Sequence, residues 1–209
     1  WKNRADWARQ VNIYTEYSLY AMSLQTTDPQ KKIALVEALE KRNASSEYLP
    51  KAYPQLFLAY RQAGDNEKAI ALAEKVLATD QSDVDMLVVV ASDYLAKKKE
   101  PDKVHAYTAK AVELAAAQPV PEGVAEDAWK KRREGLMGAA HFISGSLYYT
   151  QSRWAQADAQ LRRALPFLDN QEMKAEALYY LGFANYKLEK GQEAANYFRQ
   201  CAAIKSRFQ

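Results

Sequence analysis

The chain has 209 residues and a mass of 23.7 kDa, and 48% of its residues are apolar while only 7 are Gly and 7 are Pro. This composition suits a folded chain that is almost entirely helical. The net charge of +3 comes from 29 basic and 26 acidic residues spread along the chain, so charge alone indicates no polyanionic partner. No apolar stretch approaches the ~20 residues that cross a bilayer, which predicts a chain without a membrane-spanning segment.

The N-terminal region predicts a pair of helices, the first over residues 4–26 and the second over Pro29–Arg42. We expect Asp28 to be the N-cap of the second helix, because its carboxylate can accept hydrogen bonds from the free N–H groups of the first turn. Pro29 suits the first helical position, where no N–H is needed. The pair forms a degenerate first repeat.

A second helix pair is predicted at residues 50–80 and a third at residues 83–117. Leu56, Phe57 and Tyr60 of the second pair correspond to Val90, Ala91 and Tyr94 of the third, in each case 34 residues later. Pro54 lies inside the first helix of the second pair and has no N–H for the helical hydrogen-bond ladder. We therefore expect that helix to begin at Tyr53 or to kink there.

The stretch after the third pair holds about 20 residues more than the period of 34 requires. Pro119 and Pro121 should end the third pair and leave a loop at residues 118–123. Beyond the loop, residues 125–151 contain helix formers throughout and predict one long helix. Pro166 should end or bend the helix that follows it.

The last two helix pairs match each other with a constant offset of 37 residues. Gly182, Tyr186 and Ala194 of the last pair correspond to Gly145, Tyr149 and Ala157 of the one before. Small residues at these spacings let the two helices of a pair touch, and bulky side chains should pack around them, namely Leu178, Leu181, Tyr186, Phe198 and Cys201. Because one pair cannot bury its own apolar face, the pattern predicts stacked copies.

A period of about 34 in helix-turn-helix units is typical of tetratricopeptide repeat (TPR) proteins. The chain resembles this family, and its bacterial members in particular. The family pattern of Leu-Gly and an aromatic residue in the first helix, with Ala and an aromatic residue in the second, is matched by Leu181, Gly182, Tyr186, Ala194 and Phe198. The match departs at Phe57 and Ala91, where a small Gly is usual. The resemblance implies an all-α fold, a right-handed α-α superhelix (TPR solenoid) of about ten helices in five pairs. It predicts one domain over residues 1–209, with repeats at approximately 4–42, 50–80, 83–117, 124–168 and 172–208.

The first helices of such repeats line a concave surface, which is the usual ligand surface of the family. The side chains expected to line a partner-binding groove are Leu58, Arg61, Val88, Ser92, Phe142, Ser146, Tyr149, Tyr179, Phe183 and Tyr186. Aromatic and apolar side chains favour a protein partner that presents an extended peptide or an amphipathic helix. The same rings could instead pack against neighbouring first helices, and the sequence leaves both interpretations open. A clamp for a terminal carboxylate, known in family members, is disfavoured because these positions lack its Lys and Asn.

An alternative function is binding to nucleic acid or an anionic surface through a basic cluster formed by Lys130, Lys131, Arg132 and Arg133. Nucleic acid is the less favoured partner, because a nucleic-acid reader usually interleaves aromatic residues with a longer basic stripe. A second basic run at residues 97–99 falls in a turn, where a solvated charge run is expected.

No residue pattern indicates catalysis. The chain has no HExxH motif, glycine-rich phosphate loop or GxSxG elbow, and no carboxylates at metal-ligand spacing. His105 and His141 fall on different repeats, and the single Cys201 stands where the repeat needs a small buried residue. We therefore predict a protein that is not an enzyme and has no cofactor or metal site.

Both ends of the chain raise questions of their own. The sequence begins at Trp1 without Met, so processing or the way the protein was produced has removed a segment, a cleaved export signal being one alternative. The compartment, cytoplasmic or exported and periplasmic, therefore stays open. At the other end we expect the last helix to run to Phe208 with apolar residues still on its outer face. Self-association through this C-terminal helix, or loss of a further helix, would account for that face.

Overall fold

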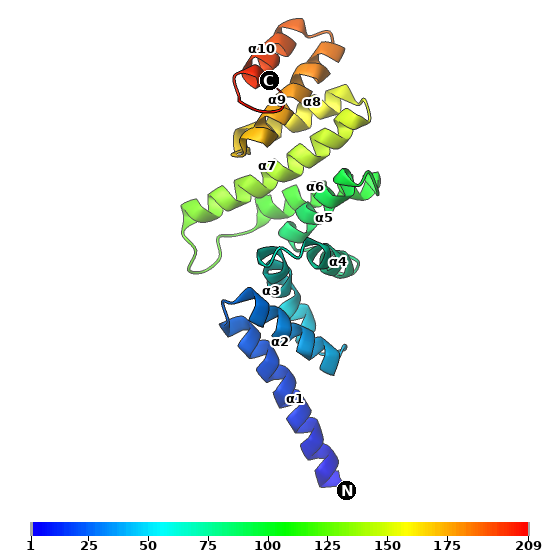
Figure 1. Ribbon diagram of the computed structural model, residues 1–209, viewed down its shortest axis with the longest axis vertical. Helices are drawn as coiled ribbons and strands as arrows, with labels where there is room; N and C mark the ends of the chain where they lie inside the picture. The colour runs from blue at the N-terminus through cyan, green and yellow to red at the C-terminus, as the bar shows by residue number, and fades with distance from the viewer. Residues whose placement is uncertain (1, 209) are drawn as a thin grey trace. The chain divides into compact units, whose positions relative to one another are not determined.

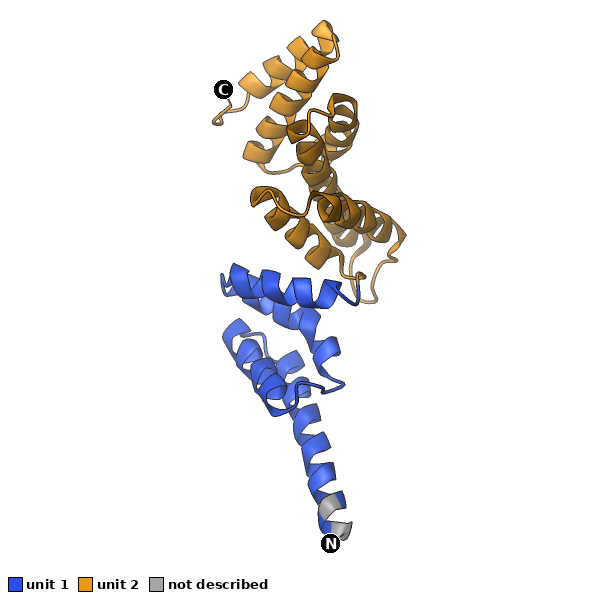
Figure 2. Ribbon diagram, turned by 90° about the vertical axis from the view of Figure 1, so that its right-hand side faces the viewer, with its two compact units in different colours: residues 1–80 blue, residues 81–209 orange. Residues whose placement is uncertain are grey.

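The computed structural model describes the backbone of residues 2–208, and the side chains of this range except those of residues 2, 3 and 5. Over the described residues the chain forms ten α-helices and one short 3-10 helix, with no strand (Figure 1). The helices belong to two compact units, residues 1–80 and residues 81–209 (Figure 2). The boundary falls between the second and the third predicted repeat, so each unit contains whole helix pairs.

Unit 1 contains two helix pairs. Its helices are α1 (Lys2–Gln25), α2 (Pro29–Arg42), α3 (Leu49–Gln62) and α4 (Asn66–Leu77). The start of α2 follows the prediction, since a carboxylate oxygen of Asp28 accepts hydrogen bonds from the backbone N–H groups of Gln30 and Lys31. The N-terminal half of α1 extends beyond α2 (Figure 1), and its residues from Asp6 to Tyr14 are exposed.

The prediction that the helix with Pro54 begins at Tyr53 is wrong. Helix α3 begins at Leu49 and runs through Pro54 without an interruption in its helical assignment. A proline in this position removes only one bond of the ladder, and the opposite face of α3 is buried at Tyr53, Leu56 and Phe57. Tertiary packing on that face therefore outweighs the local cost of the proline.

Unit 2 contains three helix pairs. Its elements are α5 (Val84–Ala96), α6 (Pro101–Ala117), α7 (Glu126–Thr150), α8 (Trp154–Ala164), the 3-10 helix η1 (Leu165–Phe167), α9 (Gln171–Lys187) and α10 (Gly191–Ala202). The prolines act as predicted, because α6 ends before Pro119 and α8 gives way to η1 at Pro166. The long helix after the loop is confirmed as α7, with 25 residues.

The close approach of helices at the two repeated glycines is confirmed. A Cβ placed on Gly145 would lie 2.7 Å from Cγ of Leu161, and a Cβ on Gly182 would lie 2.7 Å from ring atoms of Phe198. Real side chains do not approach so closely, so any larger residue at these positions must push α7 from α8, or α9 from α10. Glycine here is a packing requirement of the helix pair.

The packing of α8 on α9 depends on a buried polar network that the sequence pattern does not indicate. The Nε of Arg162 donates to both carboxylate oxygens of Asp158, at 2.8 and 3.0 Å. The amide of Asn185 donates to the same carboxylate at 2.6 Å and to the carbonyl oxygen of Leu181 at 2.8 Å. Asn185 is completely buried, whereas Tyr186, expected among the packed bulky residues, is 63% exposed. The expectation that Tyr186 packs between the helices is therefore wrong, because the buried face of α9 contains Asn185 and leaves Tyr186 on the exposed side.

The C-terminal segment also differs from the prediction. Helix α10 ends at Ala202 instead of continuing to Phe208, and the chain folds back on α9. The thiol of Cys201 donates to the carbonyl oxygens of Ala175, at 3.3 Å, and of Phe208, at 3.7 Å. Ile204 and Phe208 pack against the core of unit 2, so the folded-back segment covers part of the apolar face at its own end.

Candidate functional site

Aromatic side chains of α7, α8 and α9 form a continuous cluster in unit 2. We call this cluster the aromatic surface, and its members are Tyr149, Trp154, Tyr179, Tyr180, Phe183 and Tyr186. On α9, Tyr179, Phe183 and Tyr186 recur at spacings of four and three, which places these three on one face of the helix. Tyr149 and Trp154 flank the turn between α7 and α8 and reach the same face from the preceding pair.

The rings of the aromatic surface hold one another in place. Tyr149 stacks on Tyr180 with ring centroids 4.1 Å apart, and it meets the edges of Trp154 and Phe183 at 5.7 Å each. Phe183 in turn contacts Trp154 at 5.6 Å and Tyr186 at 6.4 Å. Offset-stacked and edge-to-face contacts at these distances are favourable for aromatic pairs. The rings are therefore already positioned in the chain without a partner.

Two tyrosines of this surface, Tyr149 and Tyr180, have a raised pKa, so their phenol groups stay neutral at physiological pH. Burial raises the pKa of Tyr180, and its hydrogen bond to Glu176, at 2.7 Å, raises that pKa further. Burial also raises the pKa of Tyr149. The ammonium group of Lys187 lies 5.4 Å from the ring centre of Phe183 and 5.9 Å from that of Tyr186, at the edge of the cluster. The surface thus combines uncharged aromatic faces with one cation at its rim.

The folded-back C-terminal segment contacts the aromatic surface. The ring of Phe208 lies 5.4 Å from that of Tyr179, and the guanidinium of Arg207 donates to Glu176 at 3.0 Å. Because Glu176 also accepts the hydrogen bond of Tyr180, one carboxylate joins the tail to the surface. The chain therefore already places one of its own aromatic side chains against this part of α9.

The structure brings together four of the predicted groove residues, Tyr149, Tyr179, Phe183 and Tyr186, in the aromatic surface. Phe142 and Ser146 of α7 are buried, at 9% and 5% exposure, and are not part of the aromatic surface. Val88 and Ser92 lie on α5, the first partly buried and the second exposed. Leu58 and Arg61 are both exposed on α3 and belong to unit 1, where Leu58 lines a hollow with Leu24, Lys32 and Gln55.

Two members of the aromatic surface were missed from the sequence. Tyr180 is adjacent to Tyr179 and lies about 100° further round the helix. The prediction considered only one face of each first helix and so omitted it. Trp154 begins α8, a second helix of its pair, whereas the prediction considered first helices only. The offset of 37 residues does not align Tyr180 with Tyr149, so their stacking follows from the packing of α9 on α7 and α8 and not from the repeat.

The basic cluster at the start of α7 is partly neutralised by carboxylates. Arg132 donates to Asp85 of α5 at 2.5 Å, and Lys131 lies 3.9 Å from Asp169. The guanidinium of Arg132 also lies over the ring of Trp129. Two of the four cations thus face acidic partners, which does not favour a surface for phosphates.

Both histidines lie in unit 2 and are partly buried. Nδ1 of His141 lies 2.7 Å from Oε1 of Gln160, and the ring of His105 stacks on Tyr148 with centroids 4.2 Å apart. Burial lowers the pKa of each histidine, although a hydrogen bond to a glutamine opposes the effect in both cases. The neutral imidazole is therefore favoured in the folded state.

Lowering the pH from about 7 to about 5.5 should destabilise unit 2. Because the folded pKa of both histidines lies below the unfolded value, the unfolded chain binds more protons in this range, and stability present at neutral pH is lost as the pH falls. Denaturant unfolding, followed by fluorescence in a background that keeps Trp154 and replaces the other three Trp with Phe, measures this change. The double variant His105→Gln/His141→Gln should show a shallower pH dependence, and an equally steep one would contradict the assignment.

Among the residues that the structure describes, no group of three or more His, Cys, Asp or Glu side chains could hold a metal ion. No helix in the same range is long and apolar enough to cross a bilayer. Burial raises the pKa of Cys201, so its thiol stays protonated within the core of unit 2.

Comparisons with known proteins give matches among solved structures alone. No family model and no curated protein matches the chain. MamA AMB-1 superposes with a TM-score of 0.59 at 15% identity, covering 93% of this chain and 92% of that one. MamA from residue 41 to its end, from Desulfovibrio magneticus RS-1, gives 0.52 at 16% identity, with 93% and 95% covered. BtubC (BKLC) from P. vanneervenii gives 0.55 at 16% identity, with 91% and 78% covered.

These solved structures are all-helical, TPR-like proteins, and the match extends over nine-tenths of this chain. At such low identity the likeness concerns the fold. It confirms the all-α helical-repeat fold expected from the internal periods of 34 and 37 residues.

Proposed function

We propose that this chain, which has the tetratricopeptide repeat fold, is a non-catalytic protein-interaction scaffold. Its unit 2 binds a peptide or helix of a partner protein through the aromatic surface. The observation that carries the proposal is the connected cluster of six rings, ending in Tyr186, whose side chain is 63% exposed. A contiguous aromatic patch that includes a large exposed ring is typical of a surface that contacts another molecule.

The physical properties of the surface suit a binding site. Its rings are fixed by mutual contacts, so little conformational entropy of these side chains is lost when a partner binds. Aromatic residues are enriched among the side chains that dominate binding energy. Since all six members of the surface are Tyr, Trp or Phe, it favours a segment with apolar, aromatic or proline side chains over a strongly charged one. The seating of Phe208 against Tyr179 supports this chemistry, because an aromatic side chain already fits there.

The proposal also accounts for the partial burial of the rings. Tyr149, Tyr179 and Phe183 pack against their neighbours and still retain exposed area. Packing between first helices and exposure to a ligand are therefore both present in the same side chains. A partner would cover the remaining edges of rings that the fold has already positioned.

Replacing Tyr186 or Phe183 with Ala should weaken peptide binding. A library of peptides displayed on phage, selected on the whole chain, supplies the ligand, and its dissociation constant is measured by calorimetry. We expect Tyr186→Ala and Phe183→Ala each to weaken binding about tenfold or more, as loss of a central aromatic contact does. Tyr14→Ala is the matched control, because Tyr14 is 73% exposed but lies on α1 of unit 1. Equal affinity in all three variants, or a selection that enriches no peptide, would refute the proposed surface.

We further propose, as a property of the same scaffold, that copies of the chain associate through the C-terminal pair of unit 2. The folded-back segment covers Cys201 but leaves Ala202 and Ala203 exposed, with Ile204 partly so. Sedimentation velocity at micromolar concentration should detect a dimer or larger species. A strict monomer at these concentrations would rule this association out without bearing on the aromatic surface.

A further inference from the structure

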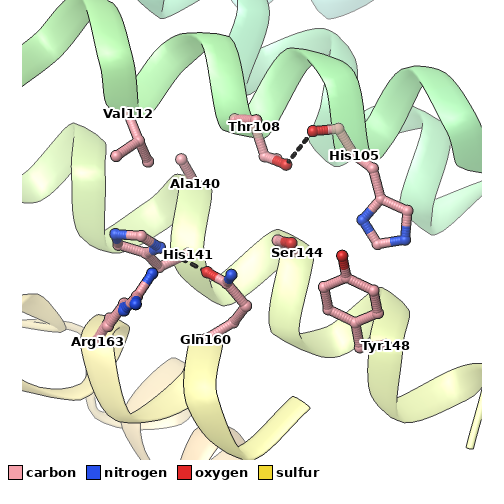
Figure 3. Close-up of a pocket in the computed structure, with 10 residues that line it drawn as sticks. His105, Thr108, Val112, Ala140, His141, Ser144, Tyr148, Gln160 and Arg163 are labelled. Carbon is pink, nitrogen blue, oxygen red and sulfur yellow. Dashed lines mark hydrogen bonds between the residues drawn. The ribbon is translucent and has the colours of Figure 1, made fainter. Parts of the chain in front are cut away.

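Unit 2 contains a pocket away from the aromatic surface, at the junction of α6, α7 and α8 (Figure 3). Its volume is about 270 Å³, and it is partly open to solvent. The polar residues that line it include His141, Ser144 and Tyr148 of α7, with Gln160 and Arg163 of α8. Ala109, Val112 and Ala140 supply an apolar wall. The size suits a small organic group.

The polar side chains of the pocket are rich in hydrogen-bond donors. Oε1 of Gln160 accepts from Nδ1 of His141 at 2.7 Å, which orients the glutamine and leaves its NH₂ group as a donor. Figure 3 shows this amide nitrogen on the side that faces Ser144. The hydroxyl groups of Ser144 and Tyr148 and the guanidinium of Arg163 add further donors. Such a set is complementary to a group that only accepts hydrogen bonds.

The pocket carries a positive charge without a carboxylate partner, on an arginine that is exposed to solvent. Arg163 is its single permanently charged residue, and no Asp or Glu is among the residues that line it. Arg163 also takes part in none of the ion pairs found among the described residues of the chain. Its charge acts on the pocket, since it helps to lower the pKa of His141, after the larger effect of burial. An anion beside Arg163 would be attracted by this charge.

We propose that the pocket binds a carboxylate group, carried either by a small organic acid or by an acidic side chain of a bound peptide. A guanidinium can hold a carboxylate through two parallel hydrogen bonds. The glutamine amide and the serine hydroxyl can donate further hydrogen bonds to the carboxylate oxygens. The apolar wall formed by Ala109, Val112 and Ala140 suits the one or two methylene groups that precede a carboxylate in short acids and in Asp or Glu. This site is independent of the aromatic surface.

The test is an NMR titration of the whole ¹⁵N-labelled chain with three probes. The probes are succinate, a short peptide with one Glu and blocked ends, and inorganic phosphate. We expect saturable shifts of amides around the pocket with succinate or the Glu peptide and weaker binding of phosphate. Binding of succinate alone assigns a small acid as ligand, and binding of the peptide alone assigns an acidic side chain of a partner. In Arg163→Met the affinity should fall about tenfold or more, and Arg163→Lys should restore part of it.

The matched control is Arg199→Met on α10, which removes the same charge from an exposed position of unit 2 outside the pocket. Its affinity for the probe should equal that of the unchanged chain. Three results would overturn the proposal: no saturable shift with either carboxylate, an equal loss in Arg199→Met, or tighter binding of phosphate than of both carboxylates. The amide spectra of the variants also report whether the fold is intact, so loss of structure is not mistaken for loss of binding.

Discussion

Replacing Asp158 with Ala should destabilise unit 2 by about 2–3 kcal/mol, the largest single-residue effect that we predict. The carboxylate accepts hydrogen bonds from Arg162 and from the completely buried Asn185, at 2.6 to 3.0 Å. Its removal leaves the amide of Asn185 without that acceptor inside the contact of α8 with α9. Because the side chain of Arg162 is 42% exposed, its charge can turn to water, which keeps the effect below that of a fully buried pair. Denaturant unfolding, followed by fluorescence in the background that keeps Trp154 as its one Trp, measures the free energy of unfolding.

Two variants serve as controls for the Asp158 network. Asp169→Ala removes a carboxylate that is 87% exposed, in the same unit, and should change the free energy of unfolding by less than about 0.5 kcal/mol. Asp158→Asn keeps one acceptor oxygen and should fall between Asp158→Ala and the unchanged chain. If Asp158→Ala and Asp169→Ala were equally stable, the network would not stabilise the contact between α8 and α9.

Substitution of alanine for two glycines of α7 should change stability in opposite directions. A Cβ on Gly145 would lie 2.7 Å from Leu161, whereas a Cβ on Gly135 would meet no atom within 4 Å. Alanine stabilises a helix interior by about 1 kcal/mol relative to glycine, but overpacking a contact costs about 1–3 kcal/mol. Gly135→Ala should therefore stabilise unit 2 by up to about 1 kcal/mol, and Gly145→Ala should destabilise it by up to about 2 kcal/mol.

The comparison is informative because both substitutions make the same chemical change in the same helix. Their difference in the free energy of unfolding isolates the contact between α7 and α8 from intrinsic helix propensity. Gly182→Ala, which would meet the ring of Phe198 at 2.7 Å, should resemble Gly145→Ala. If Gly145→Ala were as stabilising as Gly135→Ala, the close approach would be relaxed in solution and the repeat would not depend on a small residue there.

Much of the fold could be predicted because repeated contacts leave repeated residues. The offset of 37 residues that relates Gly145 to Gly182 reflects the same close approach in two helix pairs. The positions where helices begin and end also follow local chemistry, as at the N-cap Asp28 and at Pro166 in the 3-10 helix. Pro54 shows the limit of local rules, since the buried face of α3 keeps the helix continuous through a residue that disfavours it.

The candidate site was only partly predictable. The helical spacing of Tyr179, Phe183 and Tyr186 is a local property, so their common face could be anticipated. The contributions of Trp154 and Tyr180 depend on how α9 packs on α7 and α8, and no spacing within one helix contains that information. The burial of Phe142 and Ser146 has the same cause, since exposure on a single helix is decided by the neighbours that cover it.

The sequence by itself determined the all-helical class, the pairing of helices and the positions where they touch, because these follow from periodicity and from steric limits at small residues. Tertiary structure alone decided which side of each helix meets solvent, and hence that Asn185 is buried while Tyr186 is exposed. It also joined residues 19 or more positions apart, His141 with Gln160 and Asp158 with Asn185. Such contacts depend on the relative rotation of packed helices, which is set by the fit of many side chains at once.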